Sequence, residues 1–166
     1  MKKTAFTLLE IIFSITILIL IMEGAFALIA SVTTFAPLTK SRLIASYLAQ
    51  EGIEIIRNIR DQNWLVGNQW DANIVSAVIP NYIDYRSLSF PDLNCFLDYV
   101  YFDATEGYNC RRTGSITPFW RLITITKEDL NSDGSVDKMT VTIQVTWQER
   151  GRTHQVNVTE QLYNWR

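Results

Sequence analysis

Apolar residues dominate the first thirty positions of the chain and then give way to a mixed pattern. The run from Phe6 to Ala30 is almost wholly apolar, and Lys2 and Lys3 precede it. Roughly 20 apolar residues cross a bilayer as a helix, so this run is long enough to span one. Two carboxylates, Glu10 and Glu23, interrupt it. Because a charge at bilayer depth is costly and usually marks a function, a plain membrane anchor leaves Glu10 unexplained.

A second helical pattern runs from Ser41 to Trp64, in SRLIASYLAQEGIEIIRNIRDQNW. Its apolar residues recur at helical spacing on one face, which predicts that this helix packs on a sheet. These residues are Ile44, Leu48, Ile55 and Ile59. Pro37 lies just before the stretch and has no backbone N–H to donate, so we expect the helix to bend or break there.

The C-terminal part alternates between apolar and polar residues, as half-buried strands do. One strand is predicted from Phe119 to Thr126, and KMTVTIQVTWQ predicts a second. The turn ERGR, with Gly151, leads to a third strand in THQVNVTEQLYNW. These strands predict an antiparallel meander whose apolar face meets the helix, with a further strand from within residues 78–102. Residues 61–118 show no regular period, so we expect them to be irregular and exposed.

The pattern therefore predicts an α+β fold, with one long N-terminal helix packed on a C-terminal antiparallel sheet. The chain has 166 residues and a formal net charge of -2, which suits one anchor and one small domain. No basic stripe indicates specific nucleic-acid binding. There is no nucleophile motif, phosphate-binding loop or carboxylate pair, and the single histidine, His154, lies in no catalytic constellation, so we do not expect an enzyme.

Cys95 and Cys110 are the two cysteines of the chain, and both lie far from the apolar run. In an exported domain they would form a disulfide, and closing a loop of this size stabilises a fold by roughly 3 kcal/mol. The alternative is two free thiols in a reducing compartment. A zinc site is not expected, since His154 is remote from both cysteines. The three tyrosines between them either pack on the sheet or contact a partner.

The segment DLNSDGSVD, between the first two predicted strands, is rich in oxygen-bearing side chains. The candidate ligands are Asp129, Asn131, Asp133, Ser135 and Asp137. With Gly134 after the third of them, the spacing matches the front of an EF-hand calcium loop, in which Ser135 would offer its backbone carbonyl. The twelfth position, normally a bidentate glutamate, is Thr140, so water would have to complete the ligand set. Two interpretations stay open: a Ca²⁺ loop on a β scaffold, or a polar hairpin turn.

The opening KKTAFTLLEIIFSI resembles the processing site of type IV prepilins and pseudopilins. In that family a short basic leader is cut before a phenylalanine, the new N-terminus is methylated, and a glutamate follows at the fifth mature position. The resemblance implies cleavage between Ala5 and Phe6 and places Glu10 at that fifth position. The family usually has glycine before the cut. Ala5 is the smallest substitute, so we expect cleavage to be retained.

The resemblance also implies an arrangement of the whole chain. Residues 1–5 would be the leader, 6–30 the transmembrane and filament-core helix, 31–64 its amphipathic continuation, and 65–166 the globular head of a type IV pilin fold. AQEGIEIIRNIRDQNW and the C-terminal VTWQERGRTHQVNVTEQLYNWR further resemble PilV-type minor pilins. Some minor pilins and pseudopilins carry calcium in their C-terminal sheet region.

A minor pilin or pseudopilin would be an assembly subunit of a type IV pilus or a type II secretion-like filament. Its implied partners are other pilin subunits, prepilin peptidase, the inner-membrane assembly platform and the membrane itself. It would lie in the bacterial inner membrane with its C-terminal domain outside, and then in the filament. The amine of Phe6 in one subunit would pair with Glu10 of another and set the axial register. The alternative is a permanently membrane-anchored, exported binding module for adhesion or for capture of DNA or a ligand.

Overall fold

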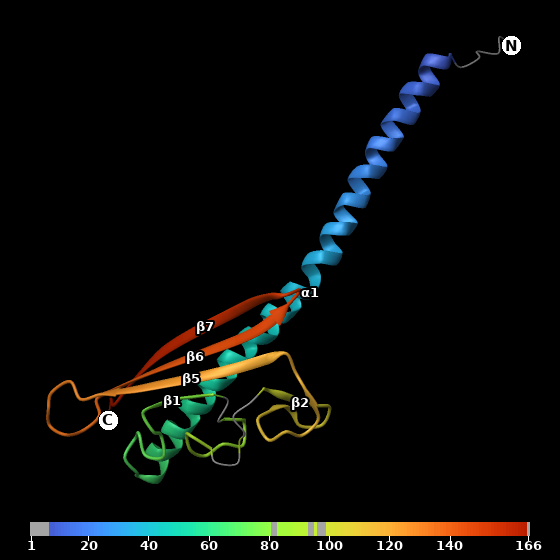
Figure 1. The fold of residues 1–166 in the computed structure, drawn as a ribbon. Coiled ribbons are helices and arrows are strands. Elements are labelled where there is room, and N and C mark those ends of the chain that lie inside the picture. Colours follow the sequence, from blue (N-terminus) through green and yellow to red (C-terminus); the bar gives the residue numbers. More distant parts are fainter. Residues whose placement is uncertain (1–6, 81–82, 93–94, 96–98, 166) are drawn as a thin grey trace. The chain divides into compact units, whose positions relative to one another are not determined.

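The computed structural model describes residues 7–80, 83–92, 95 and 99–165. These residues form one α-helix, α1 (Leu8–Val66), and seven β-strands (Figure 1). Contacts between residues divide the chain into two compact units, Met1–Lys40 and Ser41–Arg166, and α1 belongs to both. The α+β class predicted from the sequence is confirmed.

The larger sheet of the Ser41–Arg166 unit has four strands in the order β1-β5-β6-β7, all antiparallel (Figure 1). Its strands are β1 (Ala77–Pro80), β5 (Phe119–Glu128), β6 (Lys138–Glu149) and β7 (Arg152–Tyr163). The predicted meander is confirmed as β5-β6-β7, and β1 adds to the other edge of β5. The turn between β6 and β7 has positive φ at Arg150 and Gly151, the backbone conformation that suits a two-residue hairpin.

A smaller sheet contains β2 (Tyr101–Asp103), β3 (Gly107–Asn109) and β4 (Ser115–Ile116), in the order β3-β2-β4. The prediction that residues 61–118 are irregular and exposed was wrong. They contain the end of α1 and four short strands, and several of their apolar side chains, among them Trp70, Ile83 and Phe90, are buried. Strands of two to four residues are too short to leave a period that sequence analysis detects.

The second half of α1 packs on the inner face of the larger sheet. The predicted helix face is confirmed: Leu48, Ile55 and Ile59 are buried, and Ile44 is half-buried. At Gly52, an added Cβ would overlap Cδ1 of Ile143 on β6. Glycine at this position therefore leaves room for the Ile143 side chain against the helix.

Pro37 lies inside α1, which continues through it. The sequence predicted a bend or a break at this position, and α1 does not break there. A proline removes only the bond from its own nitrogen to the carbonyl four residues earlier, at a cost of about 3 kcal/mol in a helix interior. The backbone hydrogen bonds of the turns on either side of Pro37 keep α1 helical through this position.

Candidate functional site

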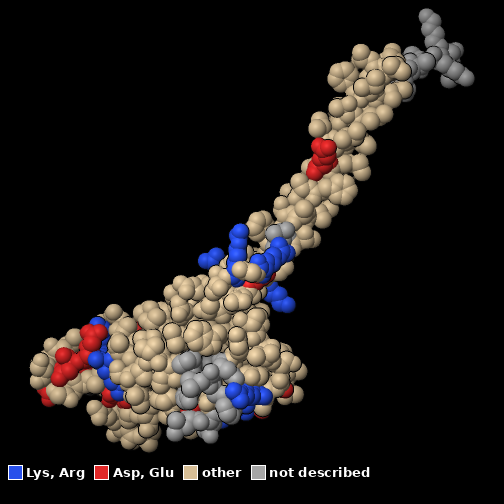
Figure 2. Space-filling view, in the orientation of Figure 1, with Lys and Arg blue, Asp and Glu red and all other residues tan. Residues whose placement is uncertain are grey.

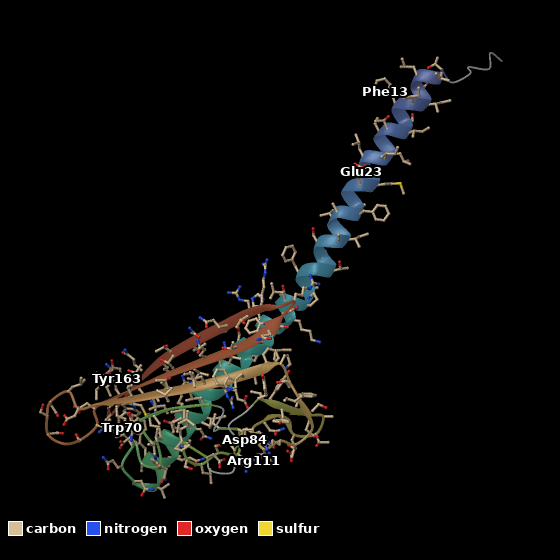
Figure 3. All side chains as sticks on the ribbon, in the orientation of Figure 1. Phe13, Glu23, Trp70, Asp84, Arg111 and Tyr163 are labelled. Carbon is tan, nitrogen blue, oxygen red and sulfur yellow. A yellow bond between two sulfur atoms is a disulfide. The ribbon has the colours of Figure 1, made fainter. Side chains whose placement is uncertain are left out.

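The first candidate site is the apolar part of α1, whose side chains are exposed in the single chain. Every side chain from Leu8 to Thr33 is exposed, and none of the most apolar 18-residue stretch of α1 is buried. The helix is long and apolar enough to cross a membrane. Figure 2 shows this stretch as almost wholly uncharged atoms, and Figure 3 labels Glu23 along it. An apolar surface of this extent marks a membrane or protein contact.

Polar side chains within this segment bond to their own helix. The hydroxyls of Ser14, Thr16 and Ser31 each donate to the carbonyl four residues earlier, at 2.8–2.9 Å. In a lipid-like environment every polar group needs such an internal partner. The segment is therefore suited to an apolar surrounding despite its serines and threonines.

Glu10 lies in the first turn of α1, where it also has a local role. Its backbone N–H donates to the carbonyl of Thr7 at 3.1 Å and lies 3.3 Å from the Thr7 hydroxyl oxygen, which caps the helix. The sequence T-L-L-E matches the capping-box pattern, and an acidic residue is favoured at a helix N-terminus. Ala5 and Phe6, the predicted cleavage and methylation positions, lie outside the described residues.

The second candidate site is the hairpin loop between β5 and β6, which holds the predicted calcium ligands (Figure 1). Three hydrogen bonds fix the side of the loop that leads into β6. Asp137 N–H donates to the carbonyl of Glu128 at 3.0 Å, and Asn164 N–H donates to the carbonyl of Asp137 at 3.0 Å. The indole Nε1 of Trp70 donates to the carbonyl of Val136 at 2.8 Å. The loop is thus bonded to the segment that follows α1 and to the C-terminal segment.

The acidic side chains of the loop accept hydrogen bonds from its own backbone. The two oxygens of Asp129 accept from Ser132 N–H at 2.6 Å and Gly134 N–H at 2.8 Å. Asp133 accepts from the N–H and the hydroxyl of Ser135 at 2.7 and 2.6 Å, and these bonds hold the pKa of Asp133 below its usual range. The carboxylates of Asp129 and Asp133 therefore stabilise the loop backbone while they stay exposed to solvent.

The fit of this loop to a calcium ion is partial. Asp137 Oδ2 accepts from Leu130 N–H at 2.8 Å and from Asn131 N–H at 3.3 Å. Thr140, at the twelfth position, lies in β6 and pairs there with both neighbouring strands. Among the described residues, the carboxylates of this loop do not form a group with converging ligand atoms. The described conformation is that of a polar hairpin with the right donor types, and calcium binding stays a prediction.

Cys95 and Cys110 form the predicted disulfide, and both are buried. A carboxylate oxygen of Asp84 and the two sulfurs lie within 4.8 Å of one another. Because the sulfurs are bonded to each other, they offer no thiolate to a metal ion. We therefore assign this group a structural role.

Asp84 belongs to a buried ionic network that sequence reasoning missed (Figure 3). Nε of Arg111 donates to Asp84 at 2.8 Å, and Nη2 of Arg111 donates to Asp92 at 2.9 Å. The hydroxyl of Ser87 donates to Asp92 and accepts from the N–H of Asp84, both at 2.9 Å. No short motif joins these residues, since Arg111 is 27 and 19 positions from its two acids. The network fixes the segments around the disulfide.

A second buried charge is Arg121, on the inner face of β5 and only 1% exposed. Its guanidinium donates to the carbonyl of Leu48 at 3.3 Å, to Glu51 at 3.4 Å and to the carbonyl of Ile83. Burial lowers the pKa of Arg121, and the carboxylates of Glu51 and Asp84 oppose that shift. Burial likewise raises the pKa of Glu51, against the attraction of Arg121. Arg121 thus links α1, β5 and the segment after β1.

Comparisons of the chain with protein-family models, with curated proteins and with solved structures find no match. The fold and sites define an α+β protein with an exposed apolar helix segment and a disulfide-bonded Ser41–Arg166 unit, which is called the head from here on.

Proposed function

We propose that this chain is a type IV pilin-like subunit, a minor pilin or pseudopilin, that assembles into a pilus or a type II secretion-like filament. One observation carries the proposal: the apolar part of α1 is exposed along its whole length and contains Glu10. Prepilin peptidase would cut between Ala5 and Phe6, and residues 6–30 would then form the filament core. The head would follow as a preformed unit.

An exposed apolar helix suits both stages of such an assembly. Lipid covers it while the subunit waits in the bacterial inner membrane, and neighbouring helices cover it in the filament. Helices associate in an apolar phase through close packing and polar pairs. The transfer therefore needs no refolding of the Ser41–Arg166 unit, whose core is built separately.

Glu10 would supply the polar pair. The cap from Thr7 satisfies the backbone N–H of Glu10 and leaves its carboxylate charge to be balanced. A buried carboxylate is costly alone and tolerable beside a cation. The amine created at Phe6 of a second subunit is such a cation, and pairing with it would fix the axial register of the filament.

The disulfide supports an exported head. Structural disulfides form and persist in oxidising compartments, and Cys95 and Cys110 are paired. The proposed location is the inner membrane with the C-terminal unit outside, followed by the filament. The partners are other pilin subunits, the peptidase and the assembly platform.

A second candidate function is a permanently membrane-anchored, exported binding module. An aromatic cleft in the Ser41–Arg166 unit favours it. Such a module would use the same apolar helix as an anchor and would need neither cleavage nor Glu10.

N-terminal mass spectrometry separates the two functions. The full chain is isolated from membranes of cells with and without prepilin peptidase. A mature chain that begins at methylated Phe6 only when the peptidase is present is the expected result. The Ala5→Gly variant, which carries the residue usual in the family, is the matched control and should be cut at least as completely. A chain that still begins at Met1 in both cells, beside a cleaved Ala5→Gly control, would favour the anchored module.

A further inference from the structure

A cleft of about 480 Å³ lies at the end of the larger sheet where β5 begins, β6 ends and β7 begins. Two exposed aromatic side chains and three polar ones line it, together with Pro118 and the buried Trp147. The five are Tyr99, Trp120, Thr146, Gln148 and Thr153. Its size lies within the range of small-ligand sites, which combine apolar walls with a few placed polar groups.

Trp147 stabilises the strands beneath the cleft. Its side chain lies on the inner face of β6, opposite Thr146 and Gln148, and it is 3% exposed. It lies between its register partners on the two neighbouring strands, Phe119 and His154. Its ring centroid is 6.1 Å from that of Phe119 and 5.4 Å from that of His154. These contacts hold the ends of the three strands together behind the cleft.

Tyr99 and Trp120 add two aromatic rings that solvent reaches, with 46% and 37% of each residue exposed. The backbone beside Tyr99 is fixed, because Val100 N–H donates to the carbonyl of Phe119 and Thr117 N–H donates to the carbonyl of Val100, both at 3.0 Å. Rigid aromatic side chains give a large contact area at a low entropic cost. The backbone that carries Tyr99 is therefore held against the start of β5.

Along the outer face of the strands, the surface that continues from the cleft is polar and uncharged, whereas the turn between β6 and β7 beside it carries Glu149, Arg150 and Arg152. No charged side chain is among the described residues that line the cleft. The outer face of β5, β6 and β7 continues with Thr124, Thr142, Gln144, Gln155, Asn157 and Thr159. Figure 2 shows much of the area over these strands without Lys, Arg, Asp or Glu. A ligand that matches this surface carries many hydrogen-bonding groups and no net charge.

We infer that this cleft binds a neutral oligosaccharide. A sugar ring presents a face of C–H groups, which stacks on an aromatic ring, and a rim of hydroxyls, which pair with amide and hydroxyl groups. Trp120 and Tyr99 supply the rings, and Gln148, Thr146 and Thr153 supply the polar partners. The uncharged lining gives no counter-charge to a phosphate or an acidic sugar. This role is independent of cleavage and holds for a filament subunit or an anchored module.

The test titrates the full chain in lipid nanodiscs, which avoid sugar-bearing detergents, with cello-, malto- and chito-oligosaccharides and with an acidic oligogalacturonate. Calorimetry measures affinity, and saturation-transfer NMR identifies the sugar protons in contact. At least one neutral oligosaccharide should bind, and the oligogalacturonate should not. Trp120→Ala should weaken binding by about tenfold or more, because tryptophan anchors carry much of a binding energy.

Two further variants keep the test informative if Trp120→Ala folds poorly. Thr153→Lys adds a charge at an exposed position of the cleft and should lower affinity while the thermal midpoint stays unchanged. Trp165→Ala removes a tryptophan that is 65% exposed and outside the cleft, and it should bind like the unmodified chain.

Three results would overturn the inference: no neutral sugar binds at millimolar concentration, the acidic sugar binds better, or the Trp120 and Thr153 variants bind normally. If no sugar binds and these two variants instead lose self-association, the cleft is a contact between copies of the chain. N-terminal processing is measured separately, so none of these results decides the proposed function.

Discussion

Arg121 places a guanidinium in the apolar interface between α1 and the larger sheet. Desolvating a charge there costs several kcal/mol, which only good hydrogen bonds and a counter-charge offset. The carbonyls of Leu48 and Ile83 and the carboxylate of Glu51 provide them. Because these partners come from two segments far from β5 in sequence, Arg121 holds three parts of the head in register.

Replacing Arg121 by methionine should lower the free energy of unfolding of the head by about 3 kcal/mol. Methionine fills much of the volume but leaves the buried carbonyl of Ile83 and the partly buried Glu51 without their donor. Denaturant unfolding of the full chain, followed by tryptophan fluorescence, measures the change. The matched control is Arg152→Met, at an exposed position of β7, which should change stability by less than about 0.5 kcal/mol. Equal stabilities of the two variants would contradict this role for Arg121.

The sequence alone predicts that Arg121 is buried, but it does not predict the partners of Arg121. Phe119, Ile123 and Ile125 alternate along β5 and face inward, and Arg121 shares their parity. Its burial could therefore be predicted from the strand. Its partners could not, because Leu48 lies 73 residues away in the sequence and Ile83 lies 38 away. The same limit applies to Asp84 and Arg111.

At the scale of elements, the contact of α1 with the larger sheet depends on a glycine. Gly52 lies so close to Ile143 that any side chain at position 52 would meet its Cδ1 atom. Helix–sheet cores are packed densely and tolerate added volume poorly. Substitutions at Gly52 and Ile143 therefore test how tightly α1 packs against β6.

Gly52→Ala should destabilise the head by up to about 2 kcal/mol, the cost of overpacking less the gain in helix propensity. Ile143→Val removes the Cδ1 atom itself and should cost about 1 kcal/mol alone. The double variant should be more stable than the sum of the two changes predicts, by about 1 kcal/mol. A double-mutant cycle by denaturant unfolding measures this coupling. If the two changes in the free energy of unfolding simply add, the helix moves away from β6 in Gly52→Ala and the new methyl group does not contact Ile143.

The hairpin between β5 and β6 can be tested for calcium directly. Ca²⁺ should raise the thermal midpoint of the full chain, since a ligand at about 100 times its dissociation constant adds about 2.7 kcal/mol. The change of Asp129 and Asp137 together to asparagine should remove the response. Asp103→Asn, outside the loop, is the matched control and should keep it. Mg²⁺ should have little effect, because it demands a stricter octahedral site. An unchanged midpoint at millimolar Ca²⁺ would leave the loop a polar hairpin.

Sequence patterns predicted those elements whose signal is local. The alternation in β5, β6 and β7 and the apolar face of α1 gave the meander and its packing. At Pro37 the helix does not break, because the hydrogen bonds of the neighbouring turns outweigh one missing bond. The sequence placed a single further strand within residues 78–102, a range that β1 and β2 each overlap in part, and gave no position for β3 or β4. Such short strands are defined by their partners.

In the whole molecule, an apolar helix segment with exposed side chains is joined to a unit that has a hydrophobic core of its own. The described residues 8–33 bury none of their side chains, whereas the Ser41–Arg166 unit has a closed core, a disulfide and two buried ionic clusters. The stability of the Ser41–Arg166 unit and the proposed assembly therefore depend on different parts of the chain. Substitutions in the apolar segment should therefore leave the thermal midpoint of the Ser41–Arg166 unit unchanged.

Glu10→Gln and Glu23→Gln test that division, because they remove the two carboxylates of the apolar segment one at a time. Glutamine keeps the capping-box pattern with Thr7, so helix initiation is preserved and only the charge is lost. If Glu10 pairs with the amine of Phe6 in a second subunit, its loss leaves a buried cation unpaired, at a cost of about 3 kcal/mol.

Incorporation into filaments should then fall by about a hundredfold for Glu10→Gln, while cleavage and the thermal midpoint of the head stay unchanged. Glu23→Gln should assemble nearly as well as the unmodified chain. Quantitative mass spectrometry of sheared filaments against the membrane fraction measures both. Equal incorporation of the two variants would remove the main physical support for a register-setting pair. A loss confined to Glu10→Gln would show that the carboxylate is kept for assembly, since the bond from the backbone N–H of residue 10 to Thr7 survives in the variant.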